Sequence, residues 1–222
     1  MKKHGWKILG ALLVLYSIIA GFLVVIPDLP IVHESLRNIF FHVCMWFAMI
    51  VLFAVSLVYS IKYLSAFHQE NDIIAGEAVN TGLLFGILGL ITGTIWAKAT
   101  WGDWWVNDVQ LNGAAVTILT YLAYTVLRSS IDEPHLRAKV SAVYNIFAFV
   151  MLLVFIGILP RITDGSIHPQ NNNQSPFAIG SLDNTMRLVF YPAIIGWIII
   201  GVWIMQIRVR IKKIKEEINS IE

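Results

Sequence analysis

Charged residues are scarce in this chain of 222 residues: aspartate, glutamate, lysine and arginine make up 14% of it, and 57% is hydrophobic. Soluble domains carry roughly 25% charged residues, because their surfaces must be hydrated. A chain with so few charges would be poorly solvated in water, so the composition indicates a membrane protein. The net charge of +2 is too small to suggest a nucleic-acid partner.

Cysteine is almost absent as well. The single cysteine, Cys44, lies in an apolar run and excludes an intrachain disulfide or a CxxC redox pair. No CxxCH sequence occurs, so the chain is not itself a cytochrome with covalently attached haem. It also has no P-loop, metal-cluster spacing or nucleophile–base pair, and we therefore expect a protein that is not an enzyme.

Long apolar runs fill most of the sequence. A hydrocarbon core of about 30 Å needs roughly 20 apolar residues per helix, and six stretches come near that length. The first follows three lysines but is long and has no clear A-x-A cleavage site, so we interpret it as a retained anchor. The predicted fold is an all-α membrane protein, a single six-transmembrane-helix bundle over residues 1–222, with spans at approximately 8–26, 39–64, 79–97, 109–127, 142–159 and 186–207.

Lysine and arginine are unevenly distributed between the two sides of this bundle. Of the 16, one side carries 12 and the other carries four, namely Arg37, Lys98, Arg161 and Arg187. Positive residues collect in cytoplasmic loops, so both termini are predicted to be cytoplasmic. The loops at 27–38, 98–108 and 160–185 then face outward.

Two of the spans have unusual sequences. The apolar part of the fourth, 114–127, has only about 14 residues, so this helix must begin nearer Asp108. The third has glycines in steps of four, three and four, which places them on one helical face. Small residues on one face let another helix approach closely, and we interpret these as packing positions: Gly82, Gly86, Gly89 and Gly93.

The segment from Trp101 to Asp108, WGDWWVND, holds three of the eight tryptophans within five residues. If it is helical, four of its side chains fall at i, i+3, i+4 and i+7 and share one face: Trp101, Trp104, Trp105 and Asp108. We predict an interfacial outer-loop helix that presents an indole platform ending in a carboxylate. An ordinary aromatic belt at the membrane surface is the alternative.

Two histidines on the predicted outer side suggest what this platform could bind. His42 falls in the outer turn of the second span, where an ionisable group is costly and usually has a partner, and His168 lies in the last outer loop. A haem site needs a flat apolar cradle, axial imidazoles and cations for the propionates. His42 and His168 could supply the imidazoles, and the tryptophans the cradle. Arg37 and Arg187 could meet the propionates, because guanidinium groups pair well with carboxylates.

With these residues the sequence resembles the CcmC/CcsA family of haem-handling proteins in cytochrome c biogenesis, and in particular its six-span CcmC type. The family's WWD motif, WGxxWxWD, is matched at Trp101, Gly102, Trp105 and Asp108, with Asn107 where the family usually has tryptophan. The resemblance extends over most of the chain.

This resemblance implies non-covalent haem b at the periplasmic face, with His42 and His168 as axial ligands of the haem iron and the tryptophan segment in contact with the haem. It also implies haem export, with delivery to a periplasmic haem chaperone for cytochrome c maturation. The expected partners are that chaperone, an ABC-type ATPase complex and a small membrane subunit. Gln110 departs from the family, which often has arginine there.

Three other functions remain open from the sequence. The first is a component of a haem lyase, which attaches haem to apocytochrome c directly; lyases are generally larger and have histidines within their spans, whereas no span here has a mid-membrane histidine. The second is a membrane cytochrome of b type, which needs histidine pairs within spans. The third is a cofactor-free assembly subunit whose tryptophans only anchor a loop. Bound haem in the purified protein would exclude the third.

Overall fold

The computed structural model describes residues 4–27, 33–163, 168 and 182–219. Within them there is no strand, and six helical segments are long and apolar enough to cross a membrane. The predicted all-α architecture with six spans is confirmed. Its elements are α1 (Gly5–Leu23), the 3₁₀ helix η1 (His33–Phe40), α2 (His42–Ala66), α3 (Gln69–Trp101), α4 (Val109–Ser129), α5 (Pro134–Leu152), the π helix η2 (Leu153–Ile158), α6 (Leu159–Ile162) and α7 (Asn184–Asn219).

Most helices are longer than the apolar runs that predict them. The sequence places the third span at 79–97, whereas α3 runs from Gln69 to Trp101. Hydropathy detects the part of a helix that lies in hydrocarbon, and α3 continues at both ends into polar surroundings. The fourth span begins where its short apolar run requires, because Asp108 caps α4 and Val109 is its first residue.

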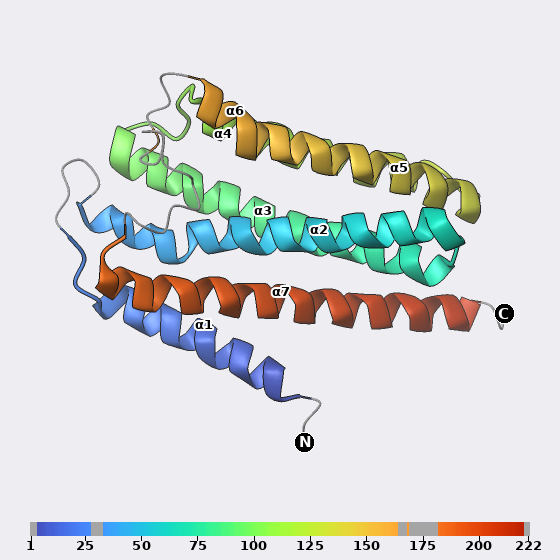
Figure 1. Cartoon of the computed structure of the whole chain (residues 1–222), viewed down its shortest axis with the longest axis horizontal. Helices are drawn as coiled ribbons and strands as arrows, with labels where there is room; N and C mark the ends of the chain where they lie inside the picture. Colours follow the sequence, from blue (N-terminus) through green and yellow to red (C-terminus); the bar gives the residue numbers. More distant parts are fainter. Residues whose placement is uncertain (1–3, 28–32, 164–167, 169–181, 220–222) are drawn as a thin grey trace.

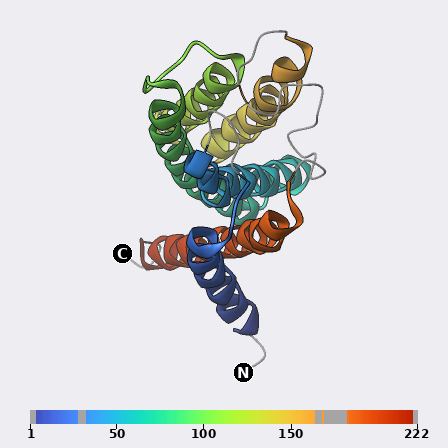
Figure 2. The same cartoon turned by 90° about the vertical axis from the view of Figure 1, so that its left-hand side faces the viewer.

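The long helices lie side by side, with α2 and α3 at the centre (Figure 1). α5 and α7 both pack on α2, and α4 packs on α3 and α5. α1 is the outlying helix and packs mainly on α7, as the end view in Figure 2 also shows. Figure 1 places η1, residues 102–108 and α6 at the same end of the bundle, on the left. We call this the outer end.

Two of the four glycines on one face of α3, Gly82 and Gly86, serve helix packing. A Cβ added at Gly82 would lie 2.5 Å from the ring of Phe53, and one at Gly86 would lie 2.3 Å from the side chain of Ile118. The Phe53 ring in turn stacks on Tyr121, with ring centroids 3.5 Å apart. The three helices α2, α3 and α4 therefore approach too closely at this level to admit a methyl group on α3.

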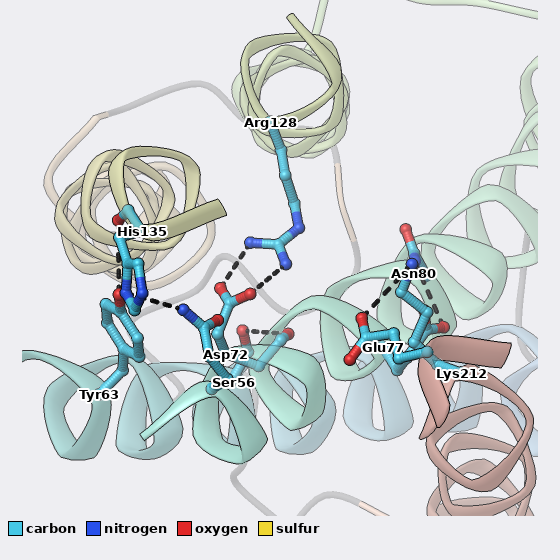
Figure 3. A network of polar contacts seen from close by, with 11 residues as sticks. Ser56, Tyr63, Asp72, Glu77, Asn80, Arg128, His135 and Lys212 are labelled. Atoms are coloured by element: carbon cyan, nitrogen blue, oxygen red, sulfur yellow. Dashed lines mark hydrogen bonds and ion pairs between the residues drawn. The ribbon is translucent and has the colours of Figure 1, made fainter. Parts of the chain in front are cut away.

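A polar network joins α2, α3, α4 and α5 toward the opposite end of the bundle (Figure 3). Arg128 of α4 donates from both terminal nitrogens to the two carboxylate oxygens of Asp72 on α3, each at 2.6 Å. Asn145 of α5 donates to the hydroxyls of Ser56 and Ser60 on α2, at 2.6 and 2.8 Å. Because buried polar groups are costly unless they are bonded, this network fixes how the four helices sit together.

The predicted interfacial helix at 101–108 is wrong. α3 continues to Trp101, Gly102 follows with a φ of +85°, and residues 102–108 have no regular structure. Glycine adopts this left-handed conformation without strain, and it commonly ends helices. The four side chains expected on one helical face are instead spread over a helix end, a loop and a helix cap.

The outer end of the fifth span is irregular. α5 gives way to η2, a π-helical turn, before α6 begins. Pro160 follows closely and has no N–H, so it cannot donate to the carbonyl of Ile156 four residues earlier, as an α-helix requires. Gly113 of α4 lies against this turn, since a Cβ there would be 2.4 Å from the carbonyl oxygen of Phe155. π turns of this kind often occur at functional sites.

Candidate functional site

A cavity of about 250 Å³ lies at the outer end, between α2, α3, α4 and η2. His42 and His168 both line it, although they come from distant segments of the chain. The other walls are mostly apolar and include Trp46, Trp96 and Trp105. Trp105, one of these lining residues, is 41% exposed.

His42 is the first residue of α2, and its ring lies against α3. Its Nδ1 is 2.9 Å from the carbonyl oxygen of Gly89 and 3.2 Å from the hydroxyl oxygen of Thr92. The ring occupies space that a side chain at Gly93 would fill, because a Cβ there would lie 2.7 Å from Cε1 of His42. On its own helix, the indole of Trp46 meets the imidazole edge-on, with centroids 6.1 Å apart.

His168 lies among indole rings. Its ring centroid is 5.6 Å from that of Trp96 and 6.0 Å from that of Trp101, and these two indoles are 4.8 Å apart. Burial lowers the pKa of His168, and the nearby carboxylate of Asp108 opposes the shift only in part. This shift favours the neutral imidazole, which is the form that binds metal ions.

The tryptophans of the motif separate into different environments. Trp101, at the end of α3, contacts His168, and Trp105 lines the cavity while its indole N–H donates to the side-chain oxygen of Asn112 at 3.2 Å. Trp104 is 59% exposed and does not line the cavity. The cradle expected from the motif alone is thus made partly by Trp96, one of two cavity tryptophans that the sequence analysis missed.

Two motif residues shape the backbone. Asp108 is 3% exposed and caps α4, since its Oδ1 accepts from the backbone N–H groups of Gln110 at 2.8 Å and Leu111 at 3.3 Å. Aspartate is among the best residues for this position because it satisfies N–H groups that have no partner within the helix. Gly102 turns the chain after α3. Its carbonyl accepts from Nζ of Lys98 at 2.5 Å.

Comparison with protein-family models matches residues 3–222 to the family described as heme exporter protein C. The chain belongs to the heme exporter protein C family. Its membership agrees with the WWD motif and with the six spans of the described residues.

Two proteins named heme exporter protein C are similar to this member of the family. The one from Paracoccus denitrificans is 28% identical over 150 residues, which is 67% of this chain and 61% of that protein. The one from Haemophilus influenzae is 28% identical over 175 residues, or 77% and 65%. A cytochrome c biogenesis protein CcsA from Prochlorococcus marinus subsp. pastoris is 34% identical over 90 residues, or 40% and 28%. The chain thus spans less than two thirds of these curated relatives.

In this member of the heme exporter protein C family, the two arginines predicted for the site lie away from the cavity. The guanidinium of Arg37 donates to Glu34 at 2.6 Å and to the carbonyls of Gly21 and Val24, at 3.0 and 2.7 Å, near the end of α1. Arg187 is half-buried in the first turn of α7 and does not line the cavity. Sequence position fixes the depth of these residues in the membrane but not the side of the helix on which they lie.

The other two glycines on this face of α3 pack against a neighbouring helix as predicted and also lie beside the cavity. Gly89 and Gly93 both line the cavity, and both lie against side chains of α2 that line it too. The signal was present in the sequence, because His42 and Trp46 are four residues apart and so share a face of α2. What the sequence could not give is the pairing of that face with the glycine face of α3.

Proposed function

We propose that the protein binds haem b non-covalently in the outer-end cavity, with His42 and His168 as axial ligands of the iron. The observation that carries this proposal is that both histidines line one apolar cavity with several indole rings. Imidazole is a common axial ligand of haem iron, and the porphyrin needs a flat apolar surrounding. The cavity residues fit both requirements, and the lowered pKa of His168 favours the neutral imidazole that the first one needs.

We propose that the outer end faces the periplasm and that both termini are cytoplasmic, in the bacterial inner membrane. The distribution of lysine and arginine supports this orientation, since only four of the 16 fall on the outer side. The six candidate spans of the described residues support a common side for both termini, because an even number returns the chain to the side from which it started.

The haem is cargo in this proposal. The protein holds it at the membrane surface and passes it to a periplasmic haem chaperone for cytochrome c maturation, together with an ABC-type ATPase complex and a small membrane subunit. The names of the two relatives denote export of haem rather than a catalysed reaction, and they support a transfer protein over an enzyme.

Replacement of each histidine tests the ligand assignment. We expect His42→Ala and His168→Ala to lower the haem content of the purified protein, read as Soret absorbance per protein, and to abolish maturation of c-type cytochromes in cells. His68→Ala is the matched control, because this histidine is exposed at the start of α3. Normal maturation with both variants would refute the assignment, and a severe loss in His33→Ala would make His33 a competing ligand.

Participation in a haem lyase is the second candidate function, and the similarity to CcsA supports it. The two candidates differ in the acceptor of the haem. The haem-loaded protein should transfer haem to a periplasmic chaperone if the export proposal holds, and to apocytochrome c without a chaperone if it acts in a lyase. Protein that is colourless after expression in haem-replete cells would favour a cofactor-free assembly subunit over both.

A further inference from the structure

We infer that Thr92 is a positioning residue for the haem ligand His42: together with the carbonyl of Gly89 it fixes the tautomer and the orientation of the imidazole, leaving Nε2 as the atom that binds iron. This inference rests on the proposed function, because it concerns how the proposed ligand is held. It assigns a role to residues of α3 that neither the WWD motif nor the two histidines include.

The hydrogen bonds of His42 determine where its proton lies. A carbonyl oxygen only accepts hydrogen bonds, so the contact of 2.9 Å between Nδ1 and the Gly89 oxygen requires a proton on Nδ1. In a neutral imidazole the other nitrogen, Nε2, then carries the lone pair. A bond of this kind from a ligating histidine to a carbonyl is the usual way in which the tautomer of a metal ligand is set.

Thr92 adds a second acceptor to the same proton. Its hydroxyl oxygen lies 3.2 Å from Nδ1 of His42. The hydroxyl can donate its own hydrogen bond to a carbonyl oxygen of its helix, that of Leu88 at 2.8 Å or that of Gly89 at 3.0 Å. Its lone pairs can then accept from the N–H of His42. The N–H of His42 is thus shared between two oxygens of α3, and the pair restricts rotation of the ring.

The glycines of α3 provide the space for this arrangement. Gly89, Thr92 and Gly93 fall at i, i+3 and i+4 and share one helical face. At Gly93 even a methyl group would collide with the imidazole, at 2.7 Å from Cε1. At Gly89 a Cβ would lie 3.0 Å from the indole of Trp46. The face therefore admits the ring of His42 and places two hydrogen-bond acceptors beside its Nδ1.

Removal of the Thr92 hydroxyl should weaken the ligand without removing it. Outer partners of metal ligands typically change metal affinity by about 10- to 100-fold. Because the Gly89 carbonyl remains, we expect Thr92→Val to speed haem loss about tenfold, at the lower end of that range. A less electron-donating imidazole also stabilises ferric iron less, so the reduction potential of the bound haem should become more positive.

The experiment compares Thr92→Val with Thr92→Ser, which keeps a hydroxyl, and with Thr125→Val as the matched control. The Thr125 hydroxyl also donates to a carbonyl of its own helix, that of Leu122 at 2.7 Å, but it is remote from the cavity. Haem is loaded into each purified full-length protein, and two quantities are measured: the rate of haem loss to excess apomyoglobin and the midpoint potential in a redox titration.

We expect Thr92→Val to retain haem, to lose it faster and to have a more positive potential, with Thr92→Ser and Thr125→Val resembling the wild type. A haem-loaded Thr92→Val protein with the wild-type potential and loss rate would overturn the inference and leave the proposed function standing. Wild-type protein that takes up no haem would overturn the proposed function, and the inference with it. If Thr92→Val does not accumulate, Thr92→Ala is measured in its place and judged by the same two quantities.

Discussion

The ion pair between Asp72 and Arg128 should dominate the stability of the end of the bundle opposite the outer-end cavity. Both side chains are largely buried, with 7% and 20% of their surfaces exposed, and two hydrogen bonds of 2.6 Å join them. The guanidinium also fills the space beside Gly76, where a Cβ would lie 3.2 Å from Nε. Asp72→Asn removes the charge of one partner with little change of shape.

The expected loss follows from the charge that remains. Removal of one partner of a buried ion pair typically costs about 3–5 kcal/mol, because the other charge stays buried without compensation. Arg128 retains some access to solvent, so we expect about 3 kcal/mol for Asp72→Asn. Replacement of both residues by apolar side chains, Asp72→Leu with Arg128→Met, removes both charges and should cost much less than the single change.

The assay is reversible unfolding of the purified protein in mixed micelles, followed by far-UV circular dichroism, with Glu216→Gln as the control. Glu216 pairs with Lys212 at 3.7 Å, and both side chains are more than 40% exposed. Exposed pairs contribute about 0–1 kcal/mol, so this control should be close to the wild type. Asp72→Asn as stable as the wild type, or a double variant less stable than Asp72→Asn, would refute the reasoning.

Three further predictions concern the cavity. Gly113→Ala should destabilise the protein by about 1–3 kcal/mol and lower its haem content, because the new Cβ would lie 2.4 Å from the carbonyl oxygen of Phe155. Gly5→Ala should change neither quantity, because no atom lies within 4 Å of a Cβ at that position. A Gly113→Ala protein with the thermal stability and haem content of the wild type would contradict this prediction. Trp105→Phe keeps a ring in the cavity but loses the bond to Asn112, so its haem content should fall less than that of Trp105→Ala, as measured by Soret absorbance. Burial lowers the pKa of His168, so the protein should still retain haem as the pH falls through about 6.5, the ordinary pKa of histidine. Haem should be lost only at a pH below the lowered pKa. A spectroscopic titration of haem loss with a midpoint at or above about 6.5 would argue against this.

The sequence predicts those parts of the structure that depend on local composition. Apolar length gives the six spans, and the cost of an ionisable group at the membrane edge singles out His42. The shared cavity of His42 and His168 was expected from the chemistry of haem, since neither residue has a local signal that names its partner. Both residues line this cavity, and their ligation of iron stays a prediction.

The structure differs from the expectations drawn from sequence where tertiary contacts decide. A spacing of i, i+3, i+4 and i+7 predicts one helical face for the tryptophan segment, but Gly102 ends the helix at the first of these residues. The position of Arg37 near the outer surface suggested a propionate contact, but its side chain bonds to carbonyls near the end of α1. Helical periodicity shows which residues share a face. It does not show where a helix ends, or which neighbouring group a side chain contacts.

The π-helical turn at Leu153–Ile158 amounts to a one-residue insertion in the fifth span. Its hydrogen bonds join residues five apart instead of four, so it accommodates one residue more than an uninterrupted α-helix would. Deletion of a single residue there would leave the rest of that span facing much as it does now, because the π turn already absorbs the extra residue. Alignments of this family that place a one-residue gap at 153–158 would therefore mark members whose cavity wall is built by a straight helix.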